Sequence, residues 1–492
     1  FYTLKRSIDA RSRQPWVNLT VMASIHEPFI DRPHIPFHFH NVSQSAKRVV
    51  IIGAGPAGLF AALELLQLGL KPIILERGKN VRDRRRDLAR LNKEGMINPD
   101  SNYCFGEGGA GTYSDGKLYT RSNKRGDINK VLQLLVKFGA EESIMYESHP
   151  HIGTNKLPRI ITAIREHIIE CGGEVHFEEK LTDFEIKNNR ISAAVTSGGN
   201  RFEGSAFILA TGHSARDIYE LLHRKKIHIE SKPFALGVRI EHPQKLIDSI
   251  QYHCNTRDPF LPPASYSLVE QVNHKGVFSF CMCPGGIIAP AATSPGELVV
   301  NGWSPSKRDN EYANSGMVVE VNTKDLATAS LKKFFPDLVV DPSDPLVLMR
   351  FQQMVEERAY QAGGGKFVAP AQRMTDFTNS RSSSSLPGCS YLPGIKSAAL
   401  ENVLPPFIHE RLREGFTAFG KKMKGYLTQE AVVVATESRT SSPVRIPRSE
   451  DFNHPQIENL YPCGEGAGYA GGIVSAAMDG ERLATTIARL YK

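Results

Sequence analysis

The segment that most constrains the fold of this chain is residues 47–77, KRVVIIGAGPAGLFAALELLQLGLKPIILER. Its Val/Ile run is typical of a strand in a parallel sheet that is covered on both faces. A glycine turn, an amphipathic helix and a second buried strand follow this run. The segment therefore predicts a strand–helix–strand unit of an α/β protein.

Within this segment, Gly53, Gly55 and Gly58 match the pattern G-x-G-x-x-G. The first glycine allows the tight turn, the second lets the backbone approach a pyrophosphate, and the third lets helix and strand pack closely. The phosphates then meet free N–H groups at the helix N-terminus. Glu76 ends the second strand, where its carboxylate would accept hydrogen bonds from the ribose hydroxyls of an adenosine. We expect an ADP-containing dinucleotide here; a glycine turn without a ligand is the alternative.

The same glycine pattern occurs twice more, at residues 106–111 (GEGGAG) and 466–471 (GAGYAG). The first has no long strand before it and no helix after it, and the second is followed by one helix before the sequence ends. Neither predicts a second complete dinucleotide domain. Glycine-rich backbone with bare N–H groups can line the rest of a long cofactor. Tight loops alone are the alternative.

Several strings in the chain resemble the FAD/NAD(P)-binding flavoprotein superfamily: GAGPAG, a later ILATG, and GEGAGYAGG near the C-terminus. FGEGGAGTYSDGKL, CMCPGG, ESRTSSPVRI and PCGEGAGYAGGIVSAAMDG look more specifically like an uncharacterised group of FAD-dependent dehydrogenases. This likeness runs from about Leu4 to the end. That group usually has a longer region before KRSIDAR, which implies that a segment is missing before Phe1.

The resemblance implies that FAD is the cofactor. In the superfamily the first fingerprint holds ADP, the segment matching residues 210–212 packs under the cofactor, and the late motif meets the pyrophosphate and ribityl chain. Glu465 stands where many relatives carry Asp. NAD(P)H would be a transient electron donor, since no second intact fingerprint exists. The residues predicted to bind FAD are Gly53, Gly55, Pro56, Ala57, Gly58, Glu76, Arg77, Gly108, Gly109, Ala110, Gly111, Thr211, Gly212, Gly464, Glu465, Gly472 and Ile473.

The sequence predicts a discontinuous Rossmann-like FAD-binding domain of α/β class, formed by residues 47–215 and 437–492. An antiparallel α+β substrate domain is predicted as an insert over residues 216–436, and residues 1–46 predict a partial, β-leaning segment. FALGVRIEHP, ASYSLVEQV, GVFSFCMCPGG, ELVVNGW and GMVVEV are the strands expected in the insert. The insert resembles the substrate domains of hydroxylase-type flavoproteins and geranylgeranyl reductases, which implies that residues 283–286 border the reaction chamber.

Two cysteines and a lysine are candidates for the chemistry, although a flavin carries out redox reactions without an identifiable catalytic side chain. Cys281 and Cys283 form a C-x-C pair on a predicted strand. They would act either as a thiolate beside the flavin ring or as small apolar fillers. Lys117, close to Asp115 in sequence, would stabilise reduced flavin or be a surface lysine.

A histidine and two arginines complete the candidates. His213 follows the ILATG turn and would be a proton shuttle or a packed residue bonded to backbone. Arg439 and Arg445 bracket TSSPV, where they would bind an acidic substrate or a cofactor phosphate, or form a structural ion pair.

The net charge of +8 suits an anionic ligand and permits binding to RNA or acidic lipid. The basic stretch at residues 82–90, RDRRRDLAR, predicts a solvated helix face. Seven scattered cysteines favour a reducing, cytoplasmic location over a disulfide framework. No apolar run reaches the ~18 residues that would span a bilayer. His34, His38 and His40 crowd together, but without cysteines or carboxylates at ligand spacing beyond Asp31 no metal is predicted.

Together these patterns predict an FAD-dependent oxidoreductase that acts on a small organic substrate and does not bind DNA. Three alternatives stay open: a reductase of unsaturated apolar chains at a membrane surface, an RNA-modifying flavoprotein, which is less favoured, and a non-catalytic FAD-binding redox sensor.

Overall fold

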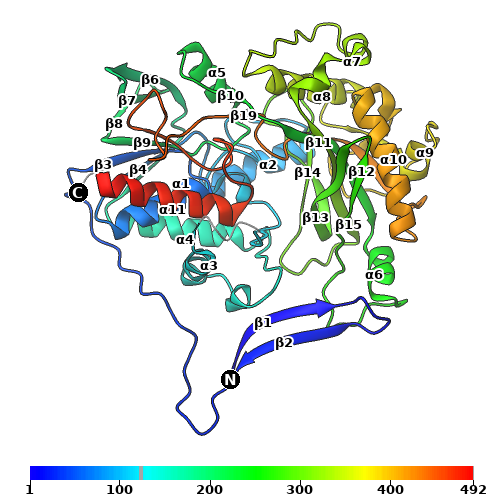
Figure 1. Cartoon of the computed structure of the whole chain (residues 1–492), viewed down its shortest axis with the longest axis horizontal. Coiled ribbons are helices and arrows are strands. Elements are labelled where there is room, and N and C mark those ends of the chain that lie inside the picture. Colours follow the sequence, from blue (N-terminus) through cyan, green and yellow to red (C-terminus); the bar gives the residue numbers. More distant parts are fainter. Residues whose placement is uncertain (121–125, 491–492) are drawn as a thin grey trace.

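The computed structural model describes residues 1–120 and 126–490. At one end of the molecule lies a five-stranded parallel sheet in the order β20-β9-β3-β4-β5 (Figure 1). Its strands are β3 (Arg48–Ile52), β4 (Lys71–Glu76), β5 (Glu174–Phe177), β9 (Ala206–Leu209) and β20 (Leu460–Pro462). Segments from both ends of the sequence thus share one sheet, which confirms the discontinuous Rossmann-like fold.

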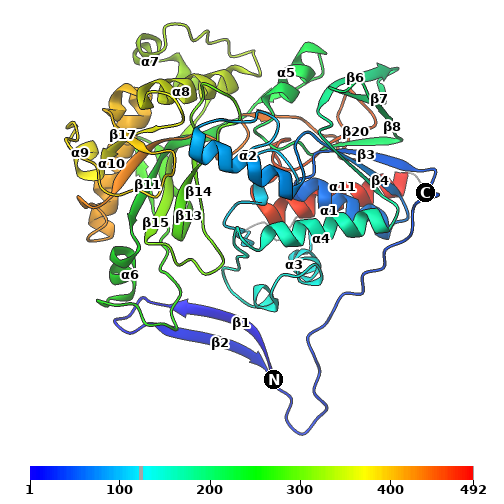
Figure 2. The same ribbon diagram turned by 180° about the vertical axis from the view of Figure 1, so that it is seen from behind.

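Both faces of this sheet are covered by other elements. Alternate residues of β3 point to opposite sides of the sheet and therefore pack into two different cores. Val49 and Ile51 pack into one core, and Val50 and Ile52 into the other. Helices that lie together in Figure 2 bury the first face: α1 (Pro56–Gln67), α3 (Ile128–Lys137), α4 (Leu157–Glu170) and α11 (Ile473–Leu490). The second face is buried by α5 (Arg216–Arg224) and an antiparallel sheet of β6 (Leu181–Lys187), β7 (Arg190–Thr196) and β8 (Arg201–Glu203).

An eight-stranded, mainly antiparallel sheet forms the other half of the molecule. Its order is β12-β13-β15-β11-β18-β16-β17, with β14 paired to β13; among the pairs of this sheet in the described residues, only β16 and β17 run parallel. The strands are β11 (Phe234–Pro243), β12 (Val269–Val272), β13 (Lys275–Pro290), β14 (Val300–Trp303), β15 (Tyr312–Val321), β16 (Ala369–Arg373), β17 (Ile395–Ser397) and β18 (Val432–Glu437). The strand expected over ASYSLVEQV is shorter than predicted and covers only its last four residues.

Alternation along β11 gives this second sheet two different faces. Leu236, Val238 and Ile240 point into an apolar core, whereas Arg239 points to the opposite face. The apolar core is closed by α6 (Gln244–Tyr252), α7 (Ala329–Phe334), α8 (Val347–Gly363), α9 (Met374–Thr378) and α10 (Pro406–Lys422). The charged face is therefore free to form a wall toward the parallel sheet.

The remaining elements lie around these two sheets. β1 (Tyr2–Asp9) and β2 (Trp16–Met22) form a hairpin that meets the segment near Glu147 through Arg6, at 2.9 Å. α2 (Val81–Glu94) follows β4, and β10 (Glu230–Ser231) pairs with β19 (Val444–Arg445). Short 3-10 helices are η1 (Gly109–Gly111), η2 (Glu142–Met145), η3 (Thr323–Ala327) and η4 (Leu400–Asn402).

Candidate cofactor-binding site

A cavity of about 440 Å³ lies between the two sheets. On one side it is lined by residues that follow the carboxyl ends of all five parallel strands, which is where open α/β sheets bind their ligands. On the other side it is lined by residues of the insert sheet, among them Phe280, Cys281 and Asn301. The cavity therefore begins at the glycine fingerprint and ends at the insert.

The fingerprint turn has the geometry that its three glycines predict. Gly53 has φ +106°, and a Cβ there would lie 2.4 Å from the Ala210 carbonyl oxygen. A Cβ on Gly58 would lie 2.0 Å from the Gly53 oxygen, so this glycine serves helix–strand packing. Gly55 is different, since a Cβ there would meet nothing within 4 Å and would point into open space. The backbone thus leaves room for a ligand directly at Gly55.

Helix α1 offers this ligand unpaired amides. Its first hydrogen bond runs from the Leu59 N–H to the Gly55 oxygen, at 2.9 Å. The N–H groups of Ala57 and Gly58 precede that bond and have no acceptor within the helix. Pro56 is the first residue of the helix, and it has no N–H group that would need an acceptor. This is a site suited to a phosphate.

Glu76 connects the fingerprint to the loop at residues 106–111. Its carboxylate accepts hydrogen bonds from the amides of Ala54, Gly78 and Gly106, each at 2.9 Å. A carboxylate has about four acceptor positions, so one remains for a ligand hydroxyl. Glu76 lines the cavity, and a ribose would meet it there.

Arg77 also lines the cavity but is held by protein groups. It pairs with Asp100 at 2.6 Å and with Asp217 at 2.9 Å, and its guanidinium stacks over the Phe105 ring at 4.1 Å. Asp100 and Asp217 thus pair with the Arg77 guanidinium, the positive charge that a ribose 2′-phosphate would need as its partner. Together with Glu76, they favour an adenosine whose ribose carries no phosphate.

Arg84 corrects one sequence prediction. The stretch 82–90 was expected to form a solvated helix face, yet Arg84 is fully buried. It shares the inner face of α2 with Val81, Leu88 and Leu91, at the spacing of one helix face. That spacing was the signal in the sequence, masked by the surrounding exposed arginines.

The Arg84 guanidinium holds the loop that carries the second glycine motif. It donates to the carbonyl oxygens of Asn102 at 2.8 Å, Glu107 at 2.8 Å, Tyr103 at 3.0 Å and Gly109 at 2.8 Å. Burial without a carboxylate partner lowers the pKa of Arg84 from its usual value. The loop thereby places Gly109, Ala110 and Gly111 on the cavity wall.

The late motif and the ILATG turn meet through a histidine. His213 Nδ1 lies 3.1 Å from Glu465 Oε2, and Nε2 lies 2.9 Å from the Arg439 carbonyl oxygen. Glu465 also accepts from the Gly472 amide. Both ring nitrogens of His213 are therefore engaged, so the histidine orients Glu465 at the cavity wall.

Arg439 lines the cavity, but its guanidinium belongs to a buried ion cluster. It lies 2.8 Å from Glu356 and 2.9 Å from Glu297, and Arg216 reaches the same two carboxylates at 2.9 and 3.0 Å. Burial disfavours the charge on Glu356, yet the two arginines lower its pKa to about 2. Arg445 stands apart, over the Tyr469 ring at 5.7 Å. Of the roles expected for Arg439, the contacts of its guanidinium in the structure are those of a structural ion pair.

At the insert end of the cavity, Lys117 meets both cysteines of the C-x-C pair. Its Nζ lies 3.5 Å from Cys281 Sγ, 3.4 Å from Cys283 Sγ and 3.4 Å from Asp115 Oδ2. Cys281 has φ +48° and sits in a bulge of β13, so the two thiols meet through this irregularity and not through simple strand alternation. Charged groups surround them, which is not the environment of apolar fillers.

Most of the predicted positions lie on the wall of this one cavity. Gly58, Gly108, Arg445 and residues 283–286, which were expected to border the reaction chamber, do not line it. Asp115 lines the wall, and its Oδ1 is buried with no hydrogen-bond partner among the described residues. Phe280 and Asn301 were missed, since neither belongs to a motif.

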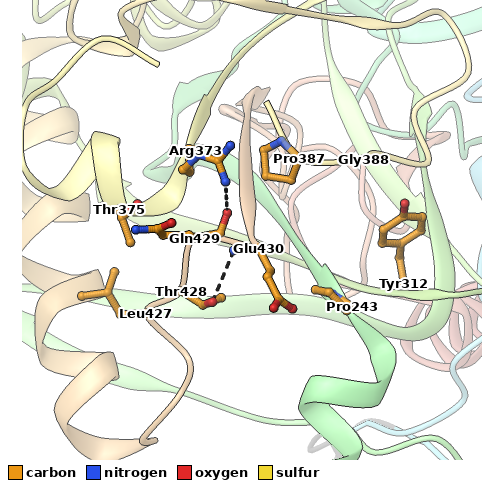
Figure 3. A pocket seen from close by; sticks show the side chains of 10 residues that line it. All are labelled: Pro243, Tyr312, Arg373, Thr375, Pro387, Gly388, Leu427, Thr428, Gln429 and Glu430. Carbon is orange, nitrogen blue, oxygen red and sulfur yellow. Dashed lines mark hydrogen bonds between the residues drawn. The ribbon is translucent and has the colours of Figure 1, made fainter. Parts of the chain in front are cut away.

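A second cavity, of about 710 Å³, lies at the opposite end of β11 and β18 (Figure 3). There Arg373 donates to the Gln429 carbonyl oxygen, and the Glu430 amide lies 3.3 Å from Thr428 Oγ1. It shares no lining residue with the first cavity. We therefore place the cofactor in the first cavity alone.

The first cavity fits FAD. The open backbone at Gly55, Gly212 and Gly472, where a Cβ would meet nothing within 4 Å, leaves room for an elongated ligand. The adenosine would lie by Glu76, the pyrophosphate by the start of α1, and the ring by the insert sheet. Fold and site together define a flavoprotein with an inserted sheet domain.

Comparison with known proteins assigns the family. Residues 46–204 match the model of an FAD binding domain, and residues 233–440 match the model of an FAD-dependent protein, C-terminal domain-like. An uncharacterized protein from Clostridium beijerinckii (strain ATCC 51743 / NCIMB 8052) is 41% identical over 502 residues, which cover 98% of this chain and 91% of the relative. The chain belongs to this family of FAD-dependent proteins, and FAD is its cofactor.

Solved flavoprotein structures are more distant. CtdE in complex with FAD is 10% identical (TM-score 0.34; 89% of this chain, 84% of that chain). A flavoprotein/dehydrogenase from Cytophaga hutchinsonii is 12% identical (0.37; 90% and 78%). A salicylate hydroxylase substrate complex is also 12% identical (0.37; 91% and 80%).

The described residues show neither a membrane-spanning helix nor a metal site. No helix among them is long and apolar enough to cross a membrane. Within the same residues, no group of three or more His, Cys, Asp or Glu side chains could hold a metal ion.

Proposed function

We propose that this protein is an oxidoreductase that uses FAD to transfer electrons to or from a small organic molecule. The observation that carries this proposal is the composition of the cavity at its insert end. Lys117, Cys281 and Asn301 gather there, opposite the adenosine end at Glu76. An FAD-binding protein without catalysis has no need for reactive side chains at that position.

The chain's own residues have distinct roles in this proposal. The start of α1 and Glu76 would hold the ADP half, and Glu465, oriented by His213, would hold the ribityl chain. When bound, FAD supplies two-electron redox chemistry. Lys117 would hold a positive charge beside the bound ring and so stabilise the negative charge that reduction adds. Burial opposes that charge, but Cys281, Cys283 and Asp115 raise the pKa of Lys117 above its usual range.

Lys117 at the insert end of the cavity favours a substrate with a negative or hydrogen-bond-accepting group over an unsaturated hydrocarbon chain. The Lys117 side chain is a third exposed and lines the cavity, so its ammonium group can donate a hydrogen bond to such a group. We propose NAD(P)H as a transient electron donor at the same chamber, and a cytoplasmic location with its reducing conditions.

Anaerobic mixing with candidate donors tests this function. We expect NADH, NADPH or a polar organic donor to bleach the absorbance of the oxidised flavin within a catalytic turnover. The reason is that such a donor would bind at the insert end of the cavity, beside the flavin ring. The control is a protein without bound FAD, the variant Gly55→Val, mixed with free FAD; it should show no reaction. If dithionite reduces the bound FAD and none of the organic donors does, the oxidoreductase proposal fails and a non-catalytic role gains support.

A further inference from the structure

The charges around Cys281 and Cys283 do not balance when both cysteines are thiols. Lys117 contacts both sulfur atoms, and the Arg239 guanidinium lies 3.5 Å from Cys283 Sγ and 2.7 Å from the Cys281 carbonyl oxygen. Arg239 is fully buried, as is Cys283. Two cations therefore point at one pair of sulfur atoms.

The carboxylates of this cluster are fewer than its cations. Asp115 lies between Lys117 at 3.4 Å and Arg308 at 2.9 Å, and Glu437 pairs with Arg239 at 3.0 Å. Three cations thus face two carboxylates. Burial raises the pKa of Glu437 to about 7, and Arg239 opposes this shift.

One thiolate would supply the missing negative charge, and an unpaired buried cation is costly. His151, the other titratable group beside Asp115, is either neutral or cationic and so supplies no negative charge; burial lowers its pKa and disfavours a fourth positive charge. The Cys283 thiol has one proton, which it can donate to the Cys281 oxygen at 3.2 Å or to the Cys281 sulfur. That donation, with Lys117 and Arg239, lowers the pKa of Cys281 well below its usual value, whereas the pKa of Cys283 is raised.

Only one of the two sulfur atoms can meet a ligand. Cys281 is partly exposed and lines the cavity, whereas Cys283 is fully buried behind it. Both sulfur atoms lie within 3.5 Å of the same Nζ atom. The bulge at Cys281 bends the strand between the two cysteines and turns both thiols to one point. This arrangement suits a redox pair in which Cys281 is the accessible thiolate and Cys283, buried behind it, is the resolving thiol.

We propose that Cys281 and Cys283 are a redox-active pair that carries two electrons between a small dithiol and the bound FAD, with Cys281 as the thiolate facing the cavity. The inference rests on the proposed function, because FAD is the electron acceptor. When the pair is oxidised, the S–H bond of Cys283 breaks, a bond between the two sulfur atoms forms, and two electrons and one proton pass to FAD. The dithiol then reopens the disulfide by thiol exchange and is itself converted to a disulfide.

The thiolate is tested by ultraviolet absorbance of the holoenzyme as a function of pH. At about pH 6, where an ordinary thiol is protonated, we expect the wild type to show the absorbance of about one thiolate per chain. Cys281→Ser should lose it, and Lys117→Met should shift its appearance to higher pH. Cys171→Ser is the matched control, a partly exposed thiol whose pKa is raised by burial, and should match the wild type. Superimposable spectra of wild type and Cys281→Ser would overturn the assignment.

The relay is tested by electron uptake. After oxidation with diamide, the tryptic peptide that contains both cysteines should be lighter by two hydrogens. Anaerobic dithionite titration should then consume four electrons per FAD in the wild type and two in Cys283→Ser. Dithiothreitol should bleach the wild-type flavin at least about tenfold faster than that of Cys283→Ser. Uptake of two electrons by the wild type refutes the relay. If both serine variants are still reduced by an organic donor at the wild-type rate, the oxidoreductase function stands without the relay.

Discussion

Replacement of Gly55 by valine is expected to leave the protein folded and to remove its FAD. A Cβ at this position meets nothing within 4 Å, and Gly55 has φ −76°, which valine can adopt. The fold should therefore lose no more than about 1 kcal/mol, the cost of a poor residue at the start of a helix. The two methyl groups would occupy the space that the pyrophosphate needs. We expect FAD binding to weaken at least about 100-fold, or by about 2.7 kcal/mol.

The measurements are the flavin-to-protein ratio after purification, a fluorescence titration with FAD, and the circular dichroism spectrum. Gly276→Val is the matched control, since its Cβ would have only ordinary contacts at 3.7 Å and it does not line the cavity. Gly58→Val provides the contrast, because its Cβ would collide with the Gly53 oxygen at 2.0 Å and should disrupt the fold itself. A Gly55→Val protein that purifies with full FAD would contradict the site.

Arg84→Met is expected to cost the protein both stability and cofactor. Methionine fills a similar volume but donates no hydrogen bond to the carbonyl oxygens of Asn102, Glu107, Tyr103 and Gly109. These oxygens would remain buried without the donor that now satisfies them. We expect the free energy of unfolding to fall by about 3–5 kcal/mol. The loop at residues 106–111 would lose its position, so the FAD content should fall as well.

Urea denaturation and the flavin content of the purified protein measure the two effects. Arg82→Met is the control: it lies on the same helix but is exposed, and should change stability by less than about 0.5 kcal/mol. Equal stability of the two variants would show that Arg84 does not hold the loop.

The first half of the fold could be predicted because its signals are local. The Val/Ile strand, the three glycines and Glu76 lie within one short segment, and each has a steric reason that does not depend on the rest of the chain. The mixed α/β architecture and the antiparallel insert follow from similar patterns and are confirmed by the structure.

What the sequence left open depends on contacts between distant segments. Lys117 meets Cys281 and Cys283 across more than 160 positions of sequence, and no periodicity places a lysine opposite a bulge. Arg84 was hidden for the opposite reason, because its exposed neighbours on α2 dominate the composition of the helix. A basic run is therefore best examined position by position against the apolar face of its helix.

The buried cluster of Arg216, Glu297, Glu356 and Arg439 determines how the molecule can move. It joins α5, which packs on the parallel sheet, to the insert, and Glu356 has no exposed surface. A hinge between the two lobes would have to separate these charges and break several hydrogen bonds at once. We therefore expect the two lobes to keep their relative positions when ligands bind, without a hinge closure of the cavity. Small molecules would exchange through its mouth, and FAD should stay bound through prolonged dialysis.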